Sequence, residues 1–280
     1  MLKQRIITAL VLIAVLLPAL FAASPWPFAV LLLAMIGAAG WEWGRLNAAG
    51  AVGAVALGVA VAAAGAMALA AGWHLAPPVT VWWLAMLVWV LGGAWALRGG
   101  VAAWALLPAP ARWLLGFALL WTAWLALAVA KVMGVNFILS VFCLVWAADI
   151  AAYFGGRRFG RRKLAPGISP GKSWEGVWSG MLGTVLLAAF WLWLDSAFAV
   201  DSASIYTRLH GRLGVAGGVL VLVFLASMSV VGDLFESLVK RGAGAKDSSA
   251  LLPGHGGVLD RIDALLPVFP LALALCSLAP

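Results

Sequence analysis

The most chemically versatile part of this 280-residue chain is a charged stretch, residues 232–263. It holds seven ionisable side chains suited to binding a metal or phosphate, namely Asp233, Lys240, Arg241, Lys246, Asp260, Arg261 and Asp263. Asp260 and Asp263 lie one helical turn apart, and Asp233 precedes them at the end of another expected helix. Grouped carboxylates are hard oxygen ligands, which suit Mg²⁺ better than Zn²⁺. We therefore predict one or two magnesium ions held by Asp233, Asp260 and Asp263.

One possibility is that the helix before this stretch continues past Gly232. In that case one helical face presents four polar side chains in register, those of Asp233, Glu236, Ser237 and Lys240. An ionisable residue at the membrane border is expensive without a partner, so its usual meaning is functional. The structural alternative is a solvated helix end with a Glu236–Lys240 ion pair.

A glycine-rich segment, "PGHGGVLDRID", follows within the same stretch. Gly256 and Gly257 let the backbone approach a ligand closely. His255 has three possible roles, which are metal ligand, hydrogen-bond donor to a phosphate, or loop-shaping residue.

A second charged loop, residues 155–174, lies upstream. It places five basic residues between Arg157 and Lys163 and then Lys172, with glycines between them, which is what polyphosphate binding needs. The basic cluster is also explained by membrane topology and headgroup contacts. The predicted substrate-binding residues here are Asp149, Tyr153, Ser169, Lys172, Ser173 and Glu175. Acidic metal ligands combined with basic glycine-rich loops at a membrane face indicate phosphoryl or nucleotidyl transfer to a lipid.

The elements that must position these residues are membrane helices. The chain is 65% hydrophobic and 10% charged, with a mean hydropathy of +1.07, and its long apolar runs lack the alternation of barrel strands. The fold class is therefore all-α, a polytopic transmembrane bundle. We expect about nine spans, near residues 6–22, 26–44, 51–72, 79–97, 112–130, 133–154, 175–194, 213–231 and 264–279.

The distribution of basic residues sets the expected orientation. With a cytoplasmic N-terminus, all but three of the 18 Lys and Arg lie on the inside, the three being Lys131, Arg208 and Arg212. The loops 155–174 and 232–263 then both face the cytoplasm. We divide the chain into N-terminal helices, 1–130, and a catalytic region, 131–280. The net charge of +8 is explained by these short loops, so we expect no nucleic-acid partner.

The charged stretch resembles a known family signature. From Ser237 through "KR", "KDSS" and "LLPGHGGVLDRID", it is similar to the signature of the phosphatidate cytidylyltransferases. The run "SPGKSWEG", residues 169–176, is similar to a second region of that family, in which a lysine usually stands at position 171. The glycine here puts a phosphate role at that position in doubt, whereas Lys172 keeps its place.

The resemblance implies a specific reaction at a specific place. CTP and phosphatidate would give CDP-diacylglycerol and pyrophosphate with magnesium, in a bacterial inner membrane with the site facing the cytoplasm. It also implies a homodimer. Two other functions are weighed against it. A transporter or channel would use Asp149 and the broken segment 253–257, but the charges gather on one side. A CDP-alcohol phosphotransferase would need an Asp-Gly-x-x-Ala-Arg run, which the sequence lacks.

Overall fold

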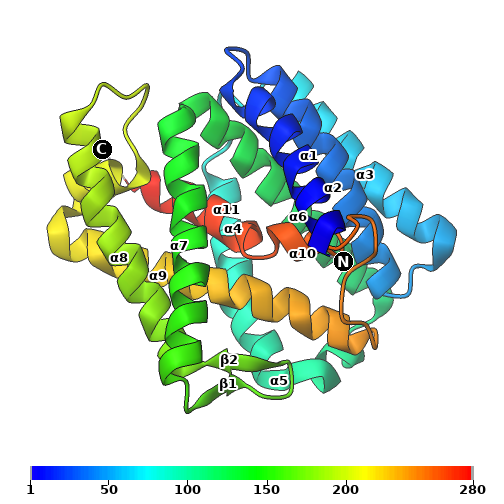
Figure 1. Cartoon of the computed structure of the whole chain (residues 1–280). Coiled ribbons are helices and arrows are strands. Elements are labelled where there is room, and N and C mark those ends of the chain that lie inside the picture. The colour runs from blue at the N-terminus through cyan, green and yellow to red at the C-terminus, as the bar shows by residue number, and fades with distance from the viewer. Residues whose placement is uncertain (1, 279–280) are drawn as a thin grey trace.

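The computed structural model describes residues 2–278, with the side chains of residues 2, 3 and 5 left out, so that Lys3 and Arg5 lie outside the described side chains. Helices dominate this part of the chain, and the predicted all-α membrane bundle is confirmed (Figure 1). Its elements are α1 Leu2–Phe21, α2 Trp26–Leu46, α3 Gly50–Ala70, α4 Thr80–Leu87, η1 Val88–Gly92, α5 Gly93–Leu106, α6 Ala109–Met133, α7 Val135–Phe159, β1 Lys163–Ala165, β2 Ser169–Ser173, α8 Trp174–Ala197, α9 Ile205–Gly242, α10 Leu259–Ile262 and α11 Leu265–Cys276.

Seven of these spans are long and apolar enough to cross a membrane among the residues described. They are α2, α3, the run α4–η1–α5, α6, α7, α8 and α9. The run α4–η1–α5 contains the predicted span 79–97 and has a kink at Gly100, where φ is +63°, after which a further helical segment extends to Leu106. Helix α1 is apolar from Ile6 to Phe21 but shorter. The count of about nine was thus approximate.

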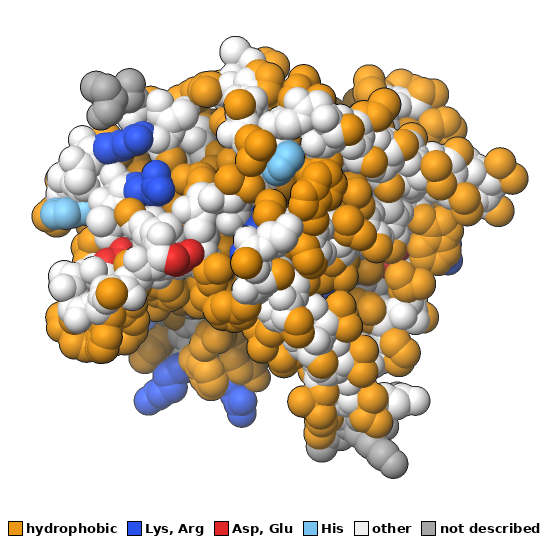
Figure 2. Space-filling view, turned by 90° about the horizontal axis from the view of Figure 1, so that it is seen from above, with side chains coloured by type: hydrophobic (Ala, Val, Ile, Leu, Met, Phe, Trp, Pro, Cys, Tyr) orange, Lys and Arg blue, Asp and Glu red, His pale blue; other side chains and the backbone are white. Residues whose placement is uncertain are grey.

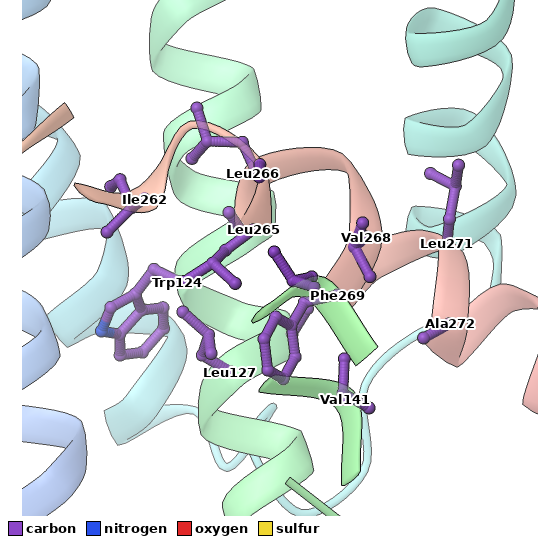
Figure 3. Close-up of a cluster of buried hydrophobic side chains, with 14 of the residues drawn as sticks. Trp124, Leu127, Val141, Ile262, Leu265, Leu266, Val268, Phe269, Leu271 and Ala272 are labelled. Carbon is purple, nitrogen blue, oxygen red and sulfur yellow. The ribbon is translucent and has the colours of Figure 1, made fainter. Parts of the chain in front are cut away.

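The last predicted span, 264–279, takes a different form. Helix α11 has only 12 residues, which is about 18 Å of helix against a hydrocarbon core of about 30 Å. Its side chains from Leu265 to Ala274 are all buried. Figure 3 shows Leu265 and Phe269 facing Trp124 of α6 and Val141 of α7. Helix α11 is therefore the core around which the longer helices gather, and sequence hydropathy cannot distinguish such a buried helix from a lipid-facing one.

Helix α9 carries the predicted catalytic face. It continues past Gly232 to Gly242, so Asp233, Glu236 and Lys240 share one face, as predicted for that case. An additional helical segment that begins at Ile205 precedes the predicted span 213–231 and joins it across a kink at Gly214, where φ is +66°.

The outer surface is apolar. Figure 2 shows hydrophobic side chains over most of the visible face, with charged groups in only a few places. On α8, Trp178, Leu182, Leu186 and Phe190 recur every four residues and are each more than half exposed. Such an exposed apolar stripe is unfavourable in water and matches a lipid contact.

A short hairpin closes one end of the bundle. Strands β1 and β2 pair antiparallel beside the end of α7 (Figure 1). We had predicted only a loop here. The hairpin connects α7 directly to α8, and these two helices lie side by side along their length.

Candidate active site

Lys240 of α9 lies at the centre of a buried ion-pair arrangement. Its Nζ atom is 2.5 Å from Glu236 Oε2, one turn earlier, and 2.6 Å from Asp260 Oδ1 of α10. Glu236 is 2% exposed and Lys240 9% exposed, so neither charge is solvated by bulk water. A buried lysine between two carboxylates is strongly held. The Glu236–Lys240 pair that was the structural alternative is therefore present, with Asp260 added to it.

Asp260 is held by more than this lysine. Its Oδ2 atom accepts hydrogen bonds from Ser248 N at 2.8 Å and Gly257 N at 2.8 Å, and the Ser248 hydroxyl oxygen lies 2.9 Å from it. Burial raises its pKa, but the hydrogen bonds from Lys240, Gly257 and Ser248 outweigh burial and lower the pKa to about 2. Asp260 is thus ionised at neutral pH.

A second ion pair links the hairpin to α9. Lys172 Nζ of β2 is 2.7 Å from Asp233 Oδ2, and Ser237 Oγ donates to Asp233 Oδ1 at 3.4 Å. Asp263 lies near the same charges. Its burial, and then the negative charge of Asp233, raise its pKa to about 7, although Ala264 N donates to its Oδ1 atom.

These groups form one array at the end of the bundle that bears the hairpin. We call it the charged network, and its members are Lys172, Asp233, Asp263, Glu236, Lys240 and Asp260. Four carboxylates face two lysines, so full ionisation leaves an excess charge of −2. A divalent cation would balance that excess, and oxygen donors are the ligands that Mg²⁺ prefers.

The network does not present a preformed three-carboxylate cage. Among the residues described, no three His, Cys, Asp or Glu side chains already surround one point as a metal site would require. Both oxygens of the Asp260 carboxylate already accept hydrogen bonds, from Lys240, Ser248 and Gly257. The carboxylates of Asp233 and Asp263 can accept further bonds. The assignment of Asp233, Asp260 and Asp263 to a metal remains a prediction.

The first cavity lies beside the Lys172–Asp233 pair and has a volume of about 540 Å³. It brings together seven residues of interest from α7, β2 and α9, namely Asp149, Tyr153, Arg157, Ser169, Lys172, Ser173 and Asp233. Six of them were predicted to bind substrate or metal, and Arg157 belongs to the predicted basic cluster. The lining of this cavity also includes the apolar side chains of Ala152 in α7, Val177 in α8 and Val230 in α9.

The second cavity lies on the other side of the network, within the loop between α9 and α10, and has a volume of about 530 Å³. Its lining is mostly polar and includes Lys246, Asp247, His255, Gly256 and Arg261. Some predicted site residues therefore line the first cavity and others the second, and the rest line neither, namely Glu175, Ser237, Lys240, Arg241, Gly257, Asp260 and Asp263. The charged network runs from one to the other, because Lys172 and Asp233 line the first and Asp260 contacts the loop that lines the second.

Three predicted site residues also have structural contacts. Ser173 caps α8 by accepting from Gly176 N at 3.2 Å, which is a common role for serine at this position. Glu175 accepts from the backbone N–H groups of residues 161 and 162. Arg241 donates to Ile168 O of the hairpin and to Ala245 O. These contacts fix the hairpin and the α9 loop at the same end of the bundle.

One buried carboxylate at this site was missed by the sequence analysis. Glu42 of α2 is fully buried and accepts hydrogen bonds from the loop that lines the second cavity. The available signal was a single acidic residue in an apolar span, which is costly and usually functional.

Comparisons with known proteins show the family of this chain. The profile of the Cytidylyltransferase family matches residues 3–279. The chain is 40% identical to a phosphatidate cytidylyltransferase of Pseudomonas aeruginosa over 98% of this chain and 97% of that one. It is 48% identical to the enzyme of the same name from Haemophilus influenzae over 49% of this chain and 44% of that one. It is also 44% identical to a phosphatidate cytidylyltransferase of Brucella melitensis over 48% of this chain and 44% of that one.

Proposed function

Because this chain belongs to the Cytidylyltransferase family, we propose that it is an integral membrane enzyme that joins CTP and phosphatidate to give CDP-diacylglycerol and pyrophosphate. The observation that carries this function is the charged network that joins a partly apolar cavity to a polar one. The two substrates differ in the same respect as the two cavities, because phosphatidate carries apolar acyl chains whereas CTP carries only polar groups.

The first cavity is the proposed site of the phosphatidate phosphate. Arg157 and Lys172 line it and supply positive charge, while the exposed apolar faces of α7 and α8 can receive acyl chains. The second cavity is the proposed site of CTP phosphates, with Lys246 and Arg261 as the cationic groups. His255 and Gly256 contribute the loop backbone and a ring nitrogen to that lining.

The reaction itself needs little proton transfer. A phosphatidate oxygen, already ionised at neutral pH, forms a bond to the α-phosphorus of CTP as the bond from that phosphorus to the β-bridging oxygen breaks. Pyrophosphate leaves with that electron pair. The cationic side chains position the two phosphates and stabilise the charge that develops on the leaving group.

Magnesium fits this arrangement because the network carries an excess of carboxylates. Asp233 and Asp263 would hold it, and Asp260 would join them if its Lys240 contact were exchanged for the cation. When bound, a divalent ion lowers the repulsion between the substrate phosphates. Phosphate oxygens would complete its ligand set.

The proposed location is the bacterial inner membrane with the site facing the cytoplasm. Support comes from the positive-inside distribution of Lys and Arg. Contacts between Thr8 Oγ1 and Pro253 O, and between Arg241 and Ile168, gather the N-terminal helix and both charged loops at one end. A homodimer is also proposed, on the family resemblance.

The function is tested by assay of the purified protein in detergent with phosphatidate, labelled CTP and magnesium. We expect a CDP-lipid and one pyrophosphate per turnover. A lipid product accompanied by CMP would instead indicate phosphotransfer from a CDP-alcohol. A folded, monodisperse preparation that yields neither product would refute the enzymatic function.

The assignment of the two cavities predicts a division of kinetic effects. Arg157→Met in the first cavity is expected to raise KM for phosphatidate by about 10- to 100-fold, the effect of losing one charged hydrogen bond. Lys246→Met in the second cavity is expected to raise KM for CTP similarly. Each variant should leave the other KM within about threefold. Steady-state kinetics with each substrate varied in turn would measure both values, and the reverse pattern would exchange the two assignments.

A further inference from the structure

Glu42 is a buried carboxylate whose hydrogen-bond partners all come from a distant part of the chain. Its Oε1 atom accepts from Ser249 Oγ at 2.6 Å and Val258 N at 2.9 Å. Its Oε2 atom accepts from Leu259 N at 2.7 Å, and Ser248 Oγ, 3.1 Å away, donates its one proton either to Oε2 or to Asp260 Oδ2. Glu42 is 0% exposed, so the hydroxyl of Ser249, the N–H groups of Val258 and Leu259 and, in part, the hydroxyl of Ser248 take the place of its hydration.

The four donors lie at the two ends of one loop. Ser248 and Ser249 begin the segment 248–259, and Val258 and Leu259 end it, at the start of α10. A single carboxylate thus closes the loop whose residues line the second cavity. The space around Glu42 is tight, since a Cβ atom at Gly257 would lie 2.3 Å from Oε1. Glycine at position 257 is therefore needed for this closure.

The anchor reaches the charged network through one shared side chain. Ser248 Oγ lies 3.1 Å from Glu42 Oε2 and 2.9 Å from Asp260 Oδ2. Gly257, adjacent to the Val258 that donates to Glu42, also donates its N–H to Asp260. The position of the Asp260 carboxylate therefore depends on where Glu42 holds this loop.

Helix α2 is a rigid support for such an anchor. One turn beyond Glu42, Asn47 donates to Trp43 O at 2.9 Å and accepts from Trp104 at 3.2 Å and Trp113 at 2.9 Å. Trp43 itself donates to Arg112 O at 2.8 Å. These contacts fix the end of α2 against α5 and α6, so that the carboxylate has little freedom to move.

We propose that Glu42 is a positioning residue for the transfer reaction, which holds the loop 248–259 and, through Ser248, the Asp260 carboxylate. The expected effect on kcat rests on the proposed function, whereas the anchoring of the loop by Glu42 does not depend on any activity. It assigns to the N-terminal helices a direct part in building the site.

The first test is hydrogen exchange of the full chain in detergent. In Glu42→Gln the amide NH₂ can no longer accept, so one of the two backbone donors loses its partner. The amide protons of residues 258 and 259 are expected to exchange about tenfold faster or more than in the unchanged protein. Unchanged exchange at both positions would overturn the anchor, whether or not the protein is a cytidylyltransferase.

The second test is kinetic. Glu42→Gln is expected to lower kcat by about 10- to 100-fold, as losses of supporting hydrogen bonds to functional carboxylates do. Ser248→Ala keeps the Glu42 charge and provides the second variant should Glu42→Gln fail to fold. If Glu42 acts through Ser248, the double variant should lose clearly less than the product of the two single losses.

The matched control is Asp195→Asn. Asp195 is another carboxylate that accepts several hydrogen bonds, from Asn136, Ser204 and Thr207, but it belongs to the opposite end of α8 from the hairpin. The variant Asp195→Asn should keep kcat within about twofold of the unchanged protein. When it is combined with Ser248→Ala, the loss of kcat should equal the product of the two single losses. If the loss of kcat in the double variant Glu42→Gln with Ser248→Ala also equalled the product of the two single losses, the positioning role would be contradicted.

Discussion

Asp260→Asn is expected to reduce kcat by at least about 1,000-fold while the protein remains folded in the membrane, because it removes a carboxylate that holds Lys240 and that would join Asp233 and Asp263 in binding the metal. The fold should tolerate the change, since Lys240 keeps Glu236 as a partner at 2.5 Å. An asparagine oxygen can still accept from Ser248 and Gly257. The substitution therefore removes mainly the negative charge, and we expect kcat to fall much more than the stability of the fold.

The measurement is turnover per folded molecule, with folding judged by elution as a single species in detergent. Asp201→Asn is the matched control. Asp201 caps the start of α7, the end of that helix away from the hairpin, by accepting from Val135 N and Asn136 N. It should retain near-normal turnover. If Asp260→Asn also did, the carboxylate would be purely structural and the proposed metal set would be wrong.

The main features of the fold were predictable from the sequence because hydrocarbon imposes simple rules. Long apolar runs must be helical in lipid, so α2, α3, α6, α7 and α8 were predicted close to their observed positions. Helix α11 was assigned as a full span because burial against protein and burial in lipid select the same residues. Only tertiary contacts distinguish the two environments.

The candidate site was predictable in its members but not in its arrangement. The carboxylates and lysines of residues 232–263 stood out because charge is rare in this chain. That Lys240 would pair with both Glu236 and Asp260 could not be known, since the second pair spans a loop of irregular backbone. Glu42 lies about 200 residues from its partners, and no local pattern connects them.

Asp233→Asn is expected to lower kcat by about 100- to 1,000-fold and to raise the magnesium concentration for half-maximal activity by about tenfold or more. Asp233 is the network carboxylate that lines the first cavity, and it retains free acceptor capacity beside Lys172. Removing its charge lowers the excess of carboxylates that would attract a divalent cation. Activity measured across a magnesium titration gives both quantities from one experiment.

Lys172→Met should have the opposite effect on magnesium. This change removes the cation 2.7 Å from Asp233 Oδ2 and leaves that carboxylate unneutralised, so half-maximal activity should require less magnesium than in the unchanged protein. KM for phosphatidate should rise at the same time, because Lys172 lines the first cavity. Two neighbours in one ion pair would then shift the metal requirement in opposite directions. A rise in the magnesium requirement for both variants would mean that the pair acts only as a structural link between the hairpin and α9.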